Sequence, residues 1–120
     1  MKKKIILLIS GKGTNAINIT NYFQNNNSVE VSLILSNNQS SPIFENIKKY
    51  DAPAEFFNLS DFDNQVFEKI KKINPDLIVL AGFLKKISLK YINFFSKKLI
   101  WIAASLHSDE EELLDDIVII

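Results

Sequence analysis

A run of apolar residues that ends at two closely spaced glycines constrains this chain more than any other feature. Residues 5–9 are apolar at every position, which predicts a strand buried on both faces. Gly11 and Gly13 interrupt the pattern, and from Thr14 the spacing favours a helix to about Gln24. A buried strand that turns through glycines into a helix leaves unpaired backbone N–H groups at the helix start. With the helix dipole, these donors form a site for an anion, most often a phosphate.

The backbone of Gly13, Thr14 and Asn15 is the part of this junction that we expect to bind phosphate or a ribose 5-phosphate. No acidic side chain nearby would repel an anion. Glycine suits such a loop because a side chain would keep the ligand off the backbone. We therefore expect Gly13→Val to abolish binding without unfolding the domain. The alternative is a strand-to-helix connection that binds no ligand.

Two better-known phosphate loops fit these residues less well. A Walker loop has four residues between its glycines and ends in Gly-Lys-Ser/Thr, whereas Lys12 lies between the glycines here. The dinucleotide fingerprint Gly-x-Gly-x-x-Ala is satisfied by residues 11–16. That fingerprint also needs an acid near the end of the second strand, where this chain has Ser36-Asn37-Asn38. NAD is therefore the second choice of ligand.

Strand and helix patterns alternate along the rest of the chain. Further strands are predicted at residues 29–35, 54–59, 77–81 and 99–104, and helices at about 42–50, 61–73 and 88–95. In the last of these helices, Leu89, Ile92 and Phe95 form the expected inner face. This order predicts an α/β fold: a Rossmann-like, mostly parallel sheet with helices on both faces and with residues 5–9 and 77–81 as its central strands. Ligands of such sheets bind beyond the carboxyl ends of the strands.

The composition favours a cytoplasmic globular protein. Cysteine is absent, and no apolar run approaches the length of a membrane span, so no membrane partner is expected. The basic residues are all lysine, which we interpret as genome composition rather than nucleic-acid binding. The net charge of zero conceals a basic body at residues 1–108 and an acidic, then apolar, tail at residues 109–120. We expect residues 1–108 to form the domain.

Three short motifs, at residues 8–15, 36–37 and 75–83, together match the motifs of a known family in both sequence and spacing. They read Leu8-Ile9-Ser10-Gly11-Lys12-Gly13-Thr14-Asn15, Ser36-Asn37 and Pro75-Asp76-Leu77-Ile78-Val79-Leu80-Ala81-Gly82-Phe83. Together they resemble the N-terminal, phosphate-binding half of the phosphoribosylglycinamide formyltransferase (GAR transformylase) family, from about residue 3 to residue 99. The resemblance implies a transferase of de novo purine biosynthesis that moves a formyl group from 10-formyltetrahydrofolate to glycinamide ribonucleotide.

The resemblance also implies roles for individual residues. Gly13, Thr14 and Asn15 would bind the substrate phosphate through backbone N–H groups and the threonine hydroxyl. The loop after the third motif would help to form the folate pocket. Its residues are Leu84, Lys85, Lys86 and Ile87. Without the resemblance, the two lysines would be interpreted as a solvated pair.

The chain departs from the family where the chemistry should take place. Aligned on a shared Ser-Leu, Trp101 stands in place of the family's catalytic asparagine and Ala103 in place of its histidine. An indole and a methyl group cannot polarise a formyl group or stabilise a developing oxyanion. His107 lies about 13 Å further along an extended chain, at roughly 3.3 Å per residue, and is interpreted as a surface residue. The family's catalytic aspartate is expected in a C-terminal half outside these 120 residues.

The resemblance and the departures from it leave two alternative functions. The chain is either a formyltransferase by descent that is truncated and catalytically incompetent alone, or a phosphate- or nucleotide-binding module or interaction fragment on the same scaffold. The acidic residues 109–116 match no calcium loop, so no metal is predicted. The apolar residues 117–120 are expected at a sheet edge or against a second copy of the chain, which would make a homo-oligomer.

Overall fold

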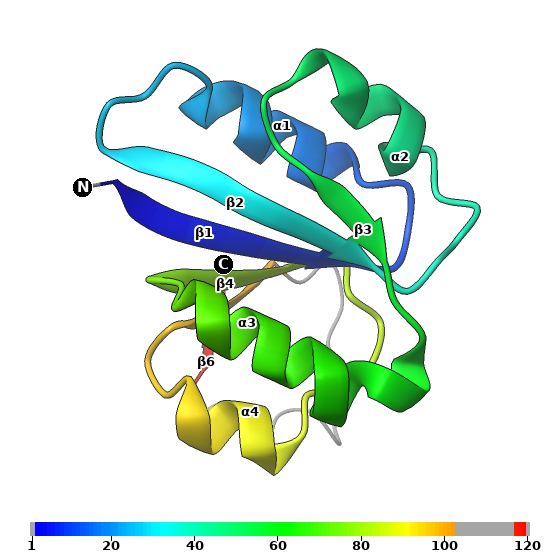
Figure 1. Ribbon diagram of the computed structural model, residues 1–120, viewed down its shortest axis with the longest axis vertical. Helices are drawn as coiled ribbons and strands as arrows, with labels where there is room; N and C mark the ends of the chain where they lie inside the picture. Colours follow the sequence, from blue (N-terminus) through cyan, green and yellow to red (C-terminus); the bar gives the residue numbers. More distant parts are fainter. Residues whose placement is uncertain (1, 103–116, 120) are drawn as a thin grey trace.

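The strands of this chain form one parallel sheet. The structure is a computed structural model, and it describes residues 2–102 and 117–119. The strand order is β3-β2-β1-β4-β5-β6, and every neighbouring pair is parallel (Figure 1). β1 (Lys3–Ile9) and β4 (Leu77–Ala81) lie at the centre, which confirms the predicted central strands. The other strands are β2 (Val29–Ser36), β3 (Ala54–Phe56), β5 (Leu99–Ile102) and β6 (Ile117–Ile119).

Helices cover both faces of the sheet, as predicted. α1 (Thr14–Phe23) and α2 (Ile43–Asn46) lie on one face, and α3 (Phe67–Ile73) and α4 (Leu89–Phe94) lie on the other (Figure 1). Side chains of β1 alternate between two hydrophobic clusters: Ile5, Leu7 and Ile9 belong to one, and Ile6 and Leu8 to the other. This alternation explains why a strand between two helix layers is apolar at every position.

The apolar residues 117–119 lie at the edge of the sheet, which is one of the two positions expected for them. β6 pairs with β5 at the edge of the sheet, with Ile117 opposite Leu99 and Ile119 opposite Trp101. The acidic residues 109–116 lie outside the described residues. Among the residues that are described, no helix has both the length and the apolar character that a membrane crossing needs.

The segment before α3 differs from the continuous helix that the sequence predicts. A 3₁₀ turn, η2 (Leu59–Asp61), leads into a π-helical turn, η3 (Phe62–Val66), and the Asp61 side chain forms no cap. The wider π turn brings Phe62, Val66 and Phe67 to the core together. The Tyr91 hydroxyl donates to the Phe62 carbonyl at 2.5 Å. Burial, with the charge of Asp63 adding to it, raises the pKa of Tyr91, so the phenol stays a neutral donor.

Two further boundaries, of a strand and of a helix, differ from those predicted from the sequence. The strand predicted over residues 54–59 ends at Phe56, and Phe57 turns into the core. The helix predicted over 42–50 is α2 followed by a 3₁₀ turn, η1 (Ile47–Lys49).

The predicted inner face of α4 is wrong at one position. Leu89 is 63% exposed, whereas Tyr91 is fully buried. Tyr91 takes the inner position because its ring stacks on Phe62, with the centroids 4.2 Å apart. Ile92 and Phe95 are buried as expected.

Candidate functional site at the carboxyl edge of the sheet

The junction between β1 and α1 has the backbone geometry of an anion site. Gly13 is the residue before α1 and adopts a left-handed conformation, with φ of 86°. Its carbonyl accepts the N–H of Ile17 at 2.9 Å, which begins the helix. No side chain caps this end, and the first turn contains no acid. The N–H groups of Thr14 and Asn15 therefore have no acceptor within the helix, and both residues are exposed.

The two glycines of the junction have different structural roles. A Cβ on Gly13 would lie 2.9 Å from Cδ1 of Ile43 and 3.1 Å from Cδ1 of Ile9. A Cβ on Gly11 would meet nothing within 4 Å. Contrary to the expectation from sequence, Gly13→Val should therefore destabilise the fold, because side chains of α2 and β1 already fill that space. Gly11 is the glycine that leaves open space beside the backbone.

A matched pair of variants separates these roles. Gly13→Ala is expected to lower the free energy of unfolding by about 2–4 kcal/mol, since left-handed backbone and overlap with neighbouring side chains are both unfavourable. Gly11→Ala is expected to change it by no more than about 0.5 kcal/mol. Urea unfolding followed by circular dichroism measures both. Equal unfolding midpoints for the two variants would contradict the packing described for Gly13.

Ser41 connects the glycine loop to α2. Its hydroxyl donates to the Gly11 carbonyl at 2.7 Å and accepts the Ile43 N–H at 3.3 Å. Ser41 is buried, although it precedes a proline in a polar loop. The isolated sequence gives no signal for this contact, because residues 11 and 41 are 30 positions apart.

The end of β2 lies beside the glycine loop without an acid. The Asn37 N–H donates to the Ile9 carbonyl at 3.4 Å. The buried Ser36 hydroxyl accepts the Asn38 N–H at 3.1 Å, so it serves to shape the turn. The position that would bind a ribose in a dinucleotide site therefore offers no carboxylate.

The loop after β4 meets the glycine loop at the same edge. The Ser10 N–H donates to the Gly82 carbonyl at 3.2 Å, and the Leu84 N–H donates to the Ser10 hydroxyl at 3.0 Å. Leu84 is 77% exposed, and Lys85 and Lys86 are exposed as well. Ile87 differs from them, because its side chain belongs to the hydrophobic core. Three of the four residues assigned to the folate pocket thus present their side chains to solvent.

Trp101 lies in the core rather than at an open surface. It pairs with Leu80 across β4 and β5, and its side chain is 8% exposed in the cluster beneath α3 and α4. Ala103 and His107 lie outside the described residues, so the structure does not place them relative to the glycine loop. Trp101 is therefore the one departure from the family pattern whose surroundings are described.

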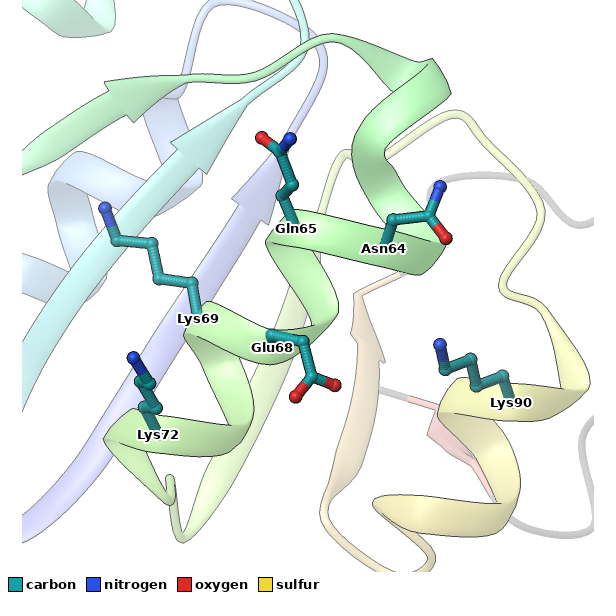
Figure 2. Close-up of a pocket in the computed structure, with 6 residues that line it drawn as sticks. All are labelled: Asn64, Gln65, Glu68, Lys69, Lys72 and Lys90. Carbon is teal, nitrogen blue, oxygen red and sulfur yellow. The ribbon is translucent and has the colours of Figure 1, made fainter.

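A surface hollow lies elsewhere, on the outer side of α3. It has a volume of about 590 Å³ and is lined by side chains of η3, α3 and α4 (Figure 2). These are Asn64, Gln65, Glu68, Lys69, Lys72 and Lys90. Lys69 pairs with Glu55, and Lys90 lies over the Phe67 ring at 4.4 Å. Because Lys69 and Lys90 already make contacts within the protein and the hollow lies away from the strand ends, we do not assign the site to it.

Comparison with known proteins identifies the family to which most of this chain belongs. A family model described as formyl transferase matches residues 3–108. Phosphoribosylglycinamide formyltransferase of Haemophilus influenzae is 29% identical over 111 residues, which cover 87% of this chain and 52% of that protein. The chain thus spans about half the length of this relative.

Solved structures of similar proteins share the fold. Phosphoribosylglycinamide formyltransferase of Anaplasma phagocytophilum aligns with a TM-score of 0.77 at 25% identity, over 90% of this chain and 52% of that one. Glycinamide ribonucleotide transformylase 1 of Geobacillus kaustophilus aligns with a TM-score of 0.78 at 23% identity, over 88% of this chain and 60% of that one. The parallel sheet with its two helix layers is therefore the fold of these enzymes.

Proposed function

This chain belongs to the formyl transferase family, and from this premise we propose that it carries the substrate-binding half of a phosphoribosylglycinamide formyltransferase. The substrate would be glycinamide ribonucleotide, bound by its phosphate. The observation that carries the proposal is the start of α1, where the left-handed Gly13 presents uncapped, exposed N–H groups with no acid in the first turn. Backbone donors and the helix dipole in this arrangement favour a dianion.

The proposal assigns separate ligands to the two loops that Ser10 joins. Gly13, Thr14 and Asn15 would bind the phosphate, and the hydroxyl of Thr14 would add one donor to the backbone groups. The exposed Leu84, Lys85 and Lys86 would contact the folate of 10-formyltetrahydrofolate. Lysine side chains next to a folate site would attract its carboxylates.

The proposal also holds that these 120 residues alone do not transfer the formyl group. In the family pattern an asparagine and a histidine act on the formyl group, and this chain has Trp101 and Ala103 at those positions. Binding and turnover are therefore separate expectations. Binding of ribose 5-phosphate tests the first expectation, and a turnover assay tests the second.

A charge placed at the start of α1 tests the phosphate site. We expect ribose 5-phosphate to shift the amide resonances of Thr14 and Asn15 in NMR titrations of the unaltered chain. Thr14→Asp should abolish these shifts while leaving stability unchanged or slightly higher, because an acid in the first turn favours the helix and repels the ligand. Asn18→Asp is the matched control: it adds the same charge at an exposed position further along α1.

Two results would oppose the phosphate site. One is the absence of any shift at Thr14 and Asn15 at millimolar ligand. The other is equal affinity in the Thr14→Asp and Asn18→Asp variants, since a site at the helix start must respond more strongly to the nearer charge.

A further inference from the structure

The segment between β4 and α4 crosses the carboxyl edge of the sheet and is hydrogen-bonded at its beginning by Ser10. The Ser10 hydroxyl accepts the Leu84 N–H at 3.0 Å, and the Ser10 N–H donates to the Gly82 carbonyl at 3.2 Å. Gly82 has φ of 74°, so the chain turns sharply there. Ser10 is the last residue before the glycine loop. One serine therefore joins this segment to the candidate phosphate site.

The other end of the segment is fixed to the π-helical turn η3. The Ser88 hydroxyl donates to Oδ1 of Asp63 at 2.9 Å, and Nζ of Lys90 donates to the Asp63 carbonyl at 2.6 Å. Ser88 precedes α4 in an extended conformation, yet its side chain does not cap that helix. The serine side chain thus serves the contact with Asp63 rather than the start of α4.

Two buried side chains stand just inside these anchors. Phe83 is 2% exposed and packs on the Phe62 ring, with the centroids 5.3 Å apart. Ile87 is 3% exposed in the same cluster. Between them, Leu84, Lys85 and Lys86 are exposed. A short exposed stretch is thereby held between two apolar anchors and two sets of hydrogen bonds.

We propose that Ser10 and Asp63 are positioning residues that hold Leu84, Lys85 and Lys86 in a preformed arrangement for the formyl donor. The inference rests on the proposed function for the identity of the ligand, and on the hydrogen bonds for the anchoring itself. A loop fixed before binding loses less conformational entropy when the ligand arrives. Release of either anchor should therefore weaken folate binding, and release of the Asp63 anchor should do so without altering the phosphate site.

Amide exchange in the ligand-free protein tests the anchoring directly. We expect the Leu84 N–H to exchange roughly fivefold faster in Ser10→Ala than in the unaltered chain, as for the loss of one hydrogen bond. Ser10→Thr retains a hydroxyl and should restore slow exchange. Ser88→Ala should speed exchange around residues 85–88. Ser96→Ala is the control, because Ser96 is exposed in the turn after α4 and its hydroxyl has no hydrogen bond to a described residue.

Titration with tetrahydrofolate tests the consequence for binding. We expect roughly two- to tenfold weaker affinity in Ser10→Ala and in Asp63→Ala, and near-normal affinity in Ser10→Thr and Asp63→Asn, whose side-chain oxygens can still accept. Affinity for ribose 5-phosphate should stay unchanged in Asp63→Ala.

The two measurements separate failure of the inference from failure of the proposed function. Unchanged exchange at Leu84 in Ser10→Ala would overturn the anchoring, whatever the chain binds. Faster exchange together with no tetrahydrofolate binding to the unaltered chain would support the anchoring and reject the folate role of this loop. Equal folate affinity in all variants would overturn the positioning role.

Discussion

Trp101→Asn is expected to lower the free energy of unfolding by about 3–5 kcal/mol, from the loss of a large buried aromatic side chain. The indole is 8% exposed, within the cluster beneath α3 and α4. An amide in its place would leave a cavity and bury polar atoms, and this second effect adds about 1–3 kcal/mol if they find no partner. Domains of this kind have total stabilities of about 5–15 kcal/mol, so a domain near the lower end of that range would lose most or all of its stability.

Circular dichroism in urea is the suitable measurement, because Trp101 is the only tryptophan and its removal abolishes tryptophan fluorescence. Trp101→Phe is the matched control: it keeps an apolar ring and should cost much less. An unfolding midpoint for Trp101→Asn equal to that of the unaltered chain would mean that the indole does not support the core. The expected loss implies that the family's asparagine cannot be restored at this position without repacking its neighbours.

The second large effect concerns catalysis. We expect the 120-residue chain to transfer formyl groups at least about 10⁴-fold more slowly than an active family member. General acid–base catalysis contributes roughly 10²–10⁴-fold, and one oxyanion donor roughly 10²–10³-fold. In the proposed alignment, Trp101 and Ala103 stand where the family has the groups for these two contributions. A spectrophotometric assay with glycinamide ribonucleotide and 10-formyltetrahydrofolate measures the rate.

The Haemophilus influenzae relative, assayed beside it, provides the positive control. The chain must also be shown to be folded by circular dichroism, so that a low rate is not caused by unfolding. Turnover on the order of once per second would place the chain among ordinary enzymes and refute the proposed incompetence.

Much of the fold was predictable because its strongest signals are local. Residues 5–9 and 77–81 are apolar at every position, and only strands covered on both faces need that pattern. The break at Gly11 and Gly13 locates the start of α1, where the structure has it. The motif at residues 8–15 begins in the last residues of β1, and the motif at 75–83 spans β4 and ends just beyond it, so the sequence also indicated which edge carries the candidate site.

Other features depended on contacts between distant residues, which no local pattern encodes. Tyr91 rather than Leu89 faces the core because Phe62, nearly 30 positions earlier, offers a ring to stack on and a carbonyl to bond. Likewise, a side chain at Gly13 is unfavourable because Ile43 of α2 occupies the space beside it.

The candidate site likewise has residues that the sequence identified and residues whose contacts only the tertiary structure shows. Gly13, Thr14 and Asn15 were identified by residue type and spacing, since a helix start exposes its own backbone donors. The roles proposed for Ser10 and Asp63 required the tertiary structure, because each bonds to a loop far along the chain. Sequence alone identified Trp101 as a departure from the family pattern, but only the packing of β5 against α3 and α4 decided that its indole is a core residue. A local pattern specifies backbone geometry, whereas a side chain's role is set by the neighbours that folding brings to it.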